Sequence, residues 1–251
     1  MTIKEIIEIE NDEFPKIKPV KEHMDIDIPD IIKSIPHYNG FIWALVGSGG
    51  SGKTSLMLNF FKNKDLYRMK FDNIFYVCPE SSFLSVKSHP FENHDKIYHE
   101  LNGNILESIY GELNEMKEQS IKDPEEYPLR YNCVIIDDMA DALKNIDIQK
   151  QLHKILIKAR HLCCAFIFTL QAFKYFPMMS RKQITNITIF KPKNYEEWDN
   201  FNKEMMGFKN EDSKTLYDYI YNEMYNHLDI DMKLDKYYKN FNLLEFVKEK
   251  K

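Results

Sequence analysis

The 251-residue sequence has few cysteines, few arginines and no long apolar run. Its four cysteines lie within apolar segments and lack metal-binding spacing, which predicts reduced core thiols rather than the disulfides of a secreted protein. The longest nearly apolar stretch, residues 162–170, has about half the length of a membrane-spanning helix. The first residues are acidic and lack the basic-then-apolar order of a signal peptide. We therefore expect an intracellular protein that is not secreted and has no membrane segment.

The acidic excess is confined to the start of the chain. Residues 1–30 hold nine acids and four lysines, whereas the other 221 residues hold thirty acids and thirty bases. This balanced remainder lacks the strongly basic character of a dedicated nucleic-acid-binding domain. Any contact with DNA must therefore come from a local basic patch or from several subunits acting together. The content of 43% hydrophobic and 29% charged residues is typical of a folded globular protein.

Prolines and apolar periodicity divide the chain into three parts. Residues 1–36 contain four prolines and no sustained helical face, which predicts an acidic N-terminal arm. Residues 37–192 alternate strand-length apolar runs with amphipathic helices, which predicts a core with a mainly parallel central sheet covered by helices on both faces. Residues 193–251 are predicted to be an extension of the same domain, with helices and then a hairpin within 228–244. The expected strands are 41–46, 73–78, 133–136, 164–169 and 184–190, and the expected helices are 54–62, 105–116 and 148–159.

Residues 47–54 form a complete phosphate-loop motif, G-x-x-x-x-G-K-S/T. Its glycines let backbone N–H groups converge on phosphate oxygens at the start of the following helix. Lys53 is expected to reach the β- and γ-phosphates, and the Thr54 hydroxyl to bind Mg²⁺. A flexible glycine- and serine-rich turn is the alternative, but the flanking strand and helix favour a nucleotide site. The residues expected to bind ATP are Gly47, Ser48, Gly49, Gly50, Ser51, Gly52, Lys53, Thr54 and Ser55.

Two adjacent acids follow the apolar run 133–136, in the position of a magnesium-binding strand end. Asp137 is expected to hold Mg²⁺ directly or through water, and Asp138 to deprotonate the attacking water. A helix cap or a solvated acid pair is the alternative, which the preceding apolar residues disfavour. A small-molecule kinase does not need a second acid for water, and the guanine-reading motif Asn-Lys-x-Asp fails in residues 63–66. These observations favour an additional-strand P-loop ATPase.

Gln171 and the arginines are the remaining candidates for catalysis. Gln171 ends an apolar strand and is predicted to orient the attacking water and sense the γ-phosphate, with a surface residue at a strand end as the alternative. If hydrolysis is gated between subunits, an arginine of a neighbour stabilises the charge on the transferring phosphoryl group. Arg160, at the end of a predicted helix, is the first candidate for this finger and Arg181 the second. A solvated arginine at a helix end is the alternative for each.

Two further groups of residues are interpreted without a catalytic role. The tyrosines at 217, 219, 221 and 225 are interpreted as packing residues rather than a platform for stacking bases. The bases at 174, 181, 182, 191 and 193 are compatible with a nucleic-acid channel, but scattered lysines are usually solvated.

Taken together, the motifs resemble a known family. The segments Gly-Ser-Gly-Gly-Ser-Gly-Lys-Thr-Ser-Leu, Val-Ile-Ile-Asp-Asp-Met, Ala-Arg-His and Phe-Thr-Leu-Gln-Ala-Phe are similar to those of genome-packaging ATPases of large eukaryotic DNA viruses and virophages. These are poxvirus-type members of the FtsK–HerA superfamily. The resemblance covers about residues 40–190, with a further similar stretch at 235–241. The superfamily more often has Glu at the position of Asp138.

The resemblance implies a P-loop NTPase of the additional-strand, RecA/FtsK–HerA-like type that uses ATP and Mg²⁺. It also implies a homo-oligomeric ring, pentameric or hexameric, that pumps double-stranded DNA into a preformed capsid in contact with a capsid component. Such a protein is expected in the host cytoplasm, a viral factory or the virion. Two alternatives stay open, a P-loop phosphotransferase acting on a small molecule and a nucleotide-gated scaffold without turnover. Stimulation of ATP turnover by DNA distinguishes the motor from the phosphotransferase.

Overall fold

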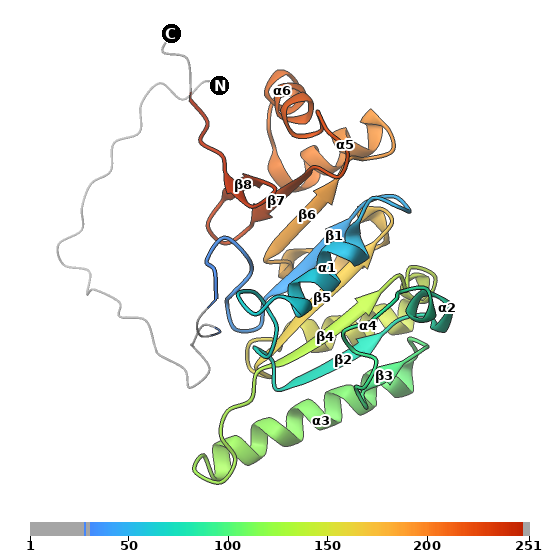
Figure 1. Ribbon diagram of the computed structural model, residues 1–251, viewed down its shortest axis with the longest axis vertical. Coiled ribbons are helices and arrows are strands. Elements are labelled where there is room, and N and C mark those ends of the chain that lie inside the picture. The colour runs from blue at the N-terminus through green and yellow to red at the C-terminus, as the bar shows by residue number, and fades with distance from the viewer. Residues whose placement is uncertain (1–27, 29–30, 248–251) are drawn as a thin grey trace, which may run out of the picture.

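A nine-stranded mixed sheet runs through the computed structural model, which describes residue 28 and residues 31–247 (Figure 1). Its strands lie in the spatial order β3-β2-β4-β5-β1-β6-β7-β8-β9. The strands from β3 to β6 are parallel, and β7, β8 and β9 are added antiparallel. The predicted mainly parallel sheet is thus confirmed, including all five expected strands. The strands are β1 (Ile42–Val46), β2 (Asn73–Val77), β3 (Ile97–Tyr98), β4 (Asn132–Asp137), β5 (Cys164–Leu170), β6 (Asn186–Phe190), β7 (His227–Asp231), β8 (Lys236–Lys239) and β9 (Asn242–Leu243).

The order of the central strands decides which residues meet at the site. Strand β1, which precedes the phosphate loop, hydrogen-bonds to β5 on one side and to β6 on the other. Strand β4, which carries the acids, lies beyond β5. One additional strand therefore separates the phosphate-loop strand from the acidic strand, as expected for an additional-strand ATPase. Because these strands are parallel, their carboxyl ends meet at one edge of the sheet.

Helices cover both faces of the sheet, as predicted, because alternate residues of each strand point to opposite faces. In β1, Ile42, Ala44 and Val46 belong to one hydrophobic core, whereas Trp43 and Leu45 belong to the other. The second core is closed by α1, which lies in front of the sheet in Figure 1, and the first by α3 to α6. The helices are α1 (Lys53–Lys62), α2 (Glu80–Leu84), α3 (Gly103–Lys122), α4 (Ile146–Leu156), α5 (Tyr195–Phe201) and α6 (Asn210–Ile220).

Helices α3 and α4 begin or end at other residues than the sequence pattern predicts. The Asn102 side chain accepts a hydrogen bond from Ile105 N at 3.0 Å, so α3 begins before the first apolar residue of its buried face. The prediction that a helix reaches Ala159 is wrong, since α4 ends at Leu156 and the next residues form turns. Arg160 therefore lies in the turn before β5 rather than at a helix end.

The segments flanking the predicted core pack against the same sheet. The N–H of Ile28 donates to the carbonyl of His37 at 2.9 Å, and Ile28 and Ile35 are buried in the core that α1 closes. The remainder of the predicted arm, residues 1–27 and 29–30, lies outside the described residues. The expected C-terminal hairpin is present as β7 and β8, and it joins the sheet through β6. Among the described residues, no helix has the length and apolarity needed to cross a bilayer.

Candidate nucleotide site

The phosphate loop connects β1 to α1 at the carboxyl edge of the sheet. Gly47 N–H donates to the carbonyl of Leu170 in β5 at 3.0 Å, which fixes the start of the loop. A Cβ at Gly47 would lie 2.7 Å from Ser51 Oγ, and Gly52 has a φ of 101°, so both positions need glycine. Lys53 Nζ donates to the carbonyl of Ser48 at 2.9 Å and thereby spans the loop. Burial lowers the pKa of Lys53, and the charges of Asp138 and Asp137 oppose that shift.

Asp137 is the last residue of β4, and its carboxylate is buried and held by three hydroxyl groups. Thr54 Oγ1 donates to Asp137 Oδ1 at 3.1 Å, and Thr169 Oγ1 donates to the same oxygen. Tyr76 in β2 donates its hydroxyl to Oδ2 at 2.7 Å. Burial, with the charge of Asp137, raises the pKa of Tyr76, so its hydroxyl remains a donor. The structure therefore brings together the two predicted magnesium ligands, Thr54 and Asp137, and orients the carboxylate.

Thr169 and Tyr76, which support Asp137, were not among the residues predicted from the sequence. Thr169 is the polar residue within the apolar run 162–170, and the sheet register pairs it directly with Asp137. That isolated polar residue was a usable signal. Tyr76 had no comparable signal, because a tyrosine in an apolar strand is common and its contact depends on the pairing of β2 with β4.

Asp138 and Gln171 meet at the surface beside Asp137. Gln171 Nε2 donates to Asp138 Oδ1 at 3.1 Å, and the N–H of Asp138 donates to Thr169 Oγ1 at 3.1 Å. Asp138 has a φ of 54°, a left-handed conformation that aspartate tolerates better than most residues. The chain thus turns sharply after β4, and the two side chains predicted to handle water are exposed and adjacent.

The residues present fit a nucleotide phosphate and a hard cation. Ser51 Oγ is buried and has no hydrogen-bond partner among the described residues, as expected for a loop that binds phosphate oxygens. Thr54 and Asp137 supply the hydroxyl and carboxylate oxygens that Mg²⁺ prefers, and Mg²⁺ bound with phosphates needs few protein ligands. The assignments of ATP and Mg²⁺ to individual residues stay predictions.

The structure does not bring the two candidate arginine fingers to the phosphate loop of their own chain. Arg160 precedes β5, at the amino edge of the sheet, and its backbone packs against Gly40 just before β1. Arg181 lies in the crossover between β5 and β6, where its Nη2 donates to the carbonyl of Lys174 at 3.3 Å and its Nη1 lies 2.7 Å from a carboxylate oxygen of Glu204. Its guanidinium also lies 4.9 Å from the centre of the Phe173 ring. Both finger roles stay predictions.

The packing interpretation of the tyrosines holds for two of the four. The rings of Tyr217 and Tyr221 lie 5.4 and 5.8 Å from that of buried Trp198. Tyr219 and Tyr225, however, are 58% and 62% exposed, so their interpretation as packing residues is wrong. Tyr225 lies beside the phosphate loop, with Cδ1 3.5 Å from the point where a Cβ on Gly52 would lie.

The strand order, together with the positions of the phosphate loop, Lys53 and Asp137, defines the fold of a P-loop ATPase of the additional-strand type. Residues 35–226 match the family model described as poxvirus A32 protein. This match covers well over half of the chain, and the chain belongs to that family. The resemblance to poxvirus-type packaging ATPases is thereby confirmed. The similar stretch at 235–241 lies beyond the matched residues.

Solved structures share the fold at low sequence identity. B204, the DNA-packaging ATPase from Sulfolobus turreted icosahedral virus, is 19% identical with a TM-score of 0.57, and the match covers 80% of this chain and 96% of that one. B204 from Sulfolobus turreted icosahedral virus 2 in complex with ATP-gammaS is 18% identical with a TM-score of 0.52, covering 83% and 99%. EssC ATPases 2 and 3 from Geobacillus thermodenitrificans are 15% identical with a TM-score of 0.56, covering 78% and 39%. The comparison with curated proteins finds no match.

Proposed function

We propose that this chain is an ATP-hydrolysing motor that moves double-stranded viral DNA into a preformed capsid. The observation that carries the proposal is the pair Asp138 and Gln171, hydrogen-bonded to each other beside the phosphate loop. A small-molecule phosphotransferase has no use for an exposed acid poised for water, so this alternative is not favoured. Membership in the poxvirus A32 family and the fold shared with a DNA-packaging ATPase support the motor.

Each residue of the site has a separate task in hydrolysis. Lys53, now bonded to the Ser48 carbonyl, exchanges that contact for the β- and γ-phosphates. Thr54 and Asp137 would hold Mg²⁺, which would neutralise charge on the phosphates. Asp138 accepts the proton of the attacking water, and Gln171 orients that water through its amide. The hydroxyls on Asp137 leave Asp138 as the carboxylate that is free to face solvent.

In a ring of identical copies, a neighbouring copy supplies the arginine finger that the nucleotide site of a single copy lacks. Arg160 lies in the turn before β5, at the amino edge of the sheet, whereas the phosphate loop lies at the carboxyl edge. A finger from Arg160 must therefore enter the site of a neighbour, as in the proposed pentamer or hexamer. Arg160, whose side chain is exposed, is the first candidate for the finger, and Arg181 is the second.

The same ring accounts for DNA binding by a chain with little net basic charge. Thirty acids balance thirty bases beyond residue 30, so a single copy attracts a phosphate backbone weakly. Aligning one modest basic patch per copy around a channel multiplies the contacts and gives useful avidity. A capsid component is the further proposed partner, and the host cytoplasm or a viral factory is the proposed location.

The deciding experiment measures ATP turnover against protein concentration, with and without double-stranded DNA. We expect turnover to rise more than linearly with concentration, to increase with DNA and to lose that increase as salt is raised. Strictly linear turnover that is indifferent to DNA would contradict the motor and favour the phosphotransferase.

Mixing two inactive variants tests the arginine in trans. Arg160→Ala copies keep an intact phosphate loop, and Lys53→Ala copies keep Arg160. If Arg160 serves a neighbour, the mixture regains part of the turnover that each variant lacks alone. Lys158→Ala, an exposed change in the same turn region, is the control that should need no partner. Failure of the mixture to recover any turnover would remove Arg160 from this role.

A further inference from the structure

A cleft opens on the side of the phosphate loop that faces away from the acids. Its volume is about 530 Å³, and it is bounded by Gly52 and Lys53 on one side and by Phe190, Tyr225 and His227 on the other. Phe190 ends β6 and His227 begins β7, so the cleft lies beyond β1 from the strands β4 and β5. A nucleotide held by its phosphates in the loop has its base within reach of this side.

We infer that this cleft, here called the aromatic cleft, binds the base of the nucleotide, with Tyr225 stacking on it and His227 selecting adenine over guanine. The inference rests on the nucleotide binding proposed above and adds the residues that recognise the base. Neither residue belongs to the phosphate loop or to the acid pair.

Tyr225 has the exposure and position of a stacking residue. Its side chain is 62% exposed although its ring lies against the loop, with Cδ1 3.5 Å from the Cβ position of Gly52. Its φ of 67° is left-handed, an uncommon and costly conformation for a residue with a large side chain. A ring in that position presents an open aromatic face, and a base stacks well on such a face.

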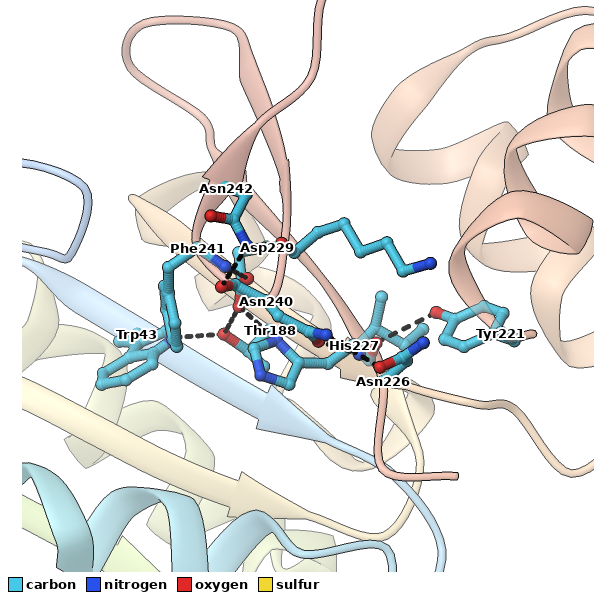
Figure 2. A network of polar contacts seen from close by, with 11 residues as sticks. Trp43, Thr188, Tyr221, Asn226, His227, Asp229, Asn240, Phe241 and Asn242 are labelled. Carbon is cyan, nitrogen blue, oxygen red and sulfur yellow. Dashed lines mark hydrogen bonds and ion pairs between the residues drawn. The ribbon is translucent and has the colours of Figure 1, made fainter. Parts of the chain in front are cut away.

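An asparagine network holds the turn that carries Tyr225. Asn226 Nδ2 donates to Asn222 Oδ1 at 2.9 Å, and Asn240 Nδ2 donates to Asn226 Oδ1 at 2.8 Å. Asn240 Oδ1 also accepts from His227 N at 2.9 Å (Figure 2). The residues on both sides of Tyr225 are therefore fixed before any ligand arrives, which lowers the entropic cost of binding. Asn240 belongs to the stretch 235–241 that was similar to the packaging family in sequence.

His227 is oriented by a buried carboxylate. Asp229 Oδ1 lies 2.8 Å from His227 Nδ1 and accepts from the Thr188 hydroxyl at 2.7 Å, while Oδ2 accepts from Phe241 N at 2.9 Å. Thr188 is held in turn by Trp43, whose indole N–H donates to it at 3.0 Å (Figure 2). Of the two tautomers of a neutral imidazole, a carboxylate beside Nδ1 favours the one with the proton on Nδ1, because the carboxylate accepts from it. In that tautomer Nε2 carries no proton and is a hydrogen-bond acceptor, and His227 lines the cleft.

An acceptor at this place distinguishes the two purines. Adenine carries an amino group, a donor, where guanine carries the carbonyl oxygen O6, an acceptor. His227 Nε2 can accept from the amino group of adenine, whereas it faces O6 of guanine as a second acceptor and gains nothing from it. The rings of Phe190 and Phe241, centred 5.1 and 5.0 Å from the imidazole, limit its rotation.

Calorimetric titration of the full chain with ADP, GDP and pyrophosphate, each with Mg²⁺, tests the inference without depending on turnover. The unaltered chain should bind ADP about tenfold more tightly than GDP. Tyr225→Ala should weaken ADP binding about tenfold and leave pyrophosphate binding unchanged, while Tyr225→Phe keeps the affinity for ADP. Tyr219→Ala, which removes an equally exposed tyrosine outside the cleft, is the matched control.

His227→Phe removes the acceptor but keeps a flat ring, and it should bring the affinities for ADP and GDP to within about twofold of each other. If His227→Phe does not fold, two measurements still test the inference. They are the ratio of the ADP and GDP affinities of the unaltered chain, and the comparison of Tyr225→Ala with Tyr225→Phe. Equal binding of ADP and GDP by the unaltered chain, or equal effects of Tyr225→Ala and Tyr219→Ala, would overturn the inference alone. Absence of binding for pyrophosphate and both nucleotides would instead overturn the proposed function.

Discussion

The phosphate loop has two flanks of opposite character. On one side, the acid flank consists of Asp137, Asp138 and Gln171 at the ends of β4 and β5. On the other side, the aromatic flank consists of Phe190, Tyr225 and His227 at β6 and β7. The acid flank places short polar groups directly at the ends of parallel strands, whereas the aromatic flank depends on an antiparallel hairpin and its asparagine network. Phosphate chemistry and base recognition are thus carried by separate parts of the sheet, and variants should separate them.

The largest expected effect comes from Lys53, which lies between the flanks. It lines the aromatic cleft, and its charge interacts with both Asp137 and Asp138. Lys53→Ala should lower turnover by at least about 10²–10³-fold and weaken ATP binding sharply, because the charge that meets the β- and γ-phosphates is lost. Steady-state turnover and calorimetry measure the two losses. Lys62→Ala, at the exposed end of α1, is the control, and unaltered turnover in Lys53→Ala would end the phosphate-loop assignment.

Asp138→Asn should break the acid flank alone. Asparagine cannot accept the proton of water, so turnover should fall about 10²–10⁴-fold while Mg·ATP binds nearly as before. A binding titration beside a turnover assay measures the split, with the exposed Asp141→Asn as the control. Substantial activity in both Asp138→Asn and Asp137→Asn would show that the metal and base roles lie elsewhere.

Tyr76→Phe should produce a smaller effect on the same flank. The change removes the hydroxyl that holds Asp137 Oδ2 and leaves the ring in place. Because residues that orient a metal ligand typically contribute 10–100-fold to metal affinity, the Mg²⁺ concentration for half-maximal turnover should rise by about 10-fold. Tyr98→Phe, in the neighbouring strand β3, is the control. An unchanged Mg²⁺ requirement would mean that Thr54 and Thr169 suffice to orient the carboxylate.

The smallest expected effect is a difference in the rate of cysteine alkylation between Cys78, near the acid flank, and a cysteine introduced in the aromatic flank. Burial raises the pKa of Cys78, next to Tyr76, to about 12, so its thiol stays protonated at pH 8 and reacts slowly with iodoacetamide. Its labelling should increase only as the pH approaches that value, or after unfolding in urea. A cysteine introduced by Tyr225→Cys should be labelled readily at pH 8, and ADP should protect it. Mass spectrometry of the labelled peptides distinguishes the two patterns, and fast labelling of Cys78 in the folded chain would contradict the burial of this thiol.

The acid flank was predictable from sequence because its residues stand in short motifs at strand ends. In a parallel sheet, a polar residue directly after an apolar run is placed at the carboxyl edge by the strand itself, as for Asp137 and Gln171. The placement of one strand between the phosphate-loop strand and the acidic strand was predictable from the motifs alone, because they indicate an additional-strand ATPase. The contacts of Asp137 with Tyr76 and Thr169 were not predictable, because they depend on the register between strands.

The aromatic flank was missed because its strand does not resemble a buried one. In β7 the residues alternate as His227, Leu228, Asp229, Ile230 and Asp231, a pattern typical of a strand with one face in water. All five are nevertheless buried, since Thr188 bonds Asp229 at 2.7 Å and Tyr38 bonds Asp231 at 3.1 Å. The strand β3 was missed for a simpler reason, because its two residues carry no periodicity.

The two outermost strands of the sheet have a consequence for how copies of this chain associate. At one margin lies β3 and at the other β9, and each has only two residues. Strands so short offer few unpaired backbone groups to a strand of another molecule, which is one way natural proteins suppress open-ended stacking into fibres. In the ring proposed above, contacts between copies would therefore come from side chains on the faces and ends of the domain. Whether such contacts close into a ring depends on the rotation between neighbouring copies, and the short edge strands remove strand addition as a competing mode of association.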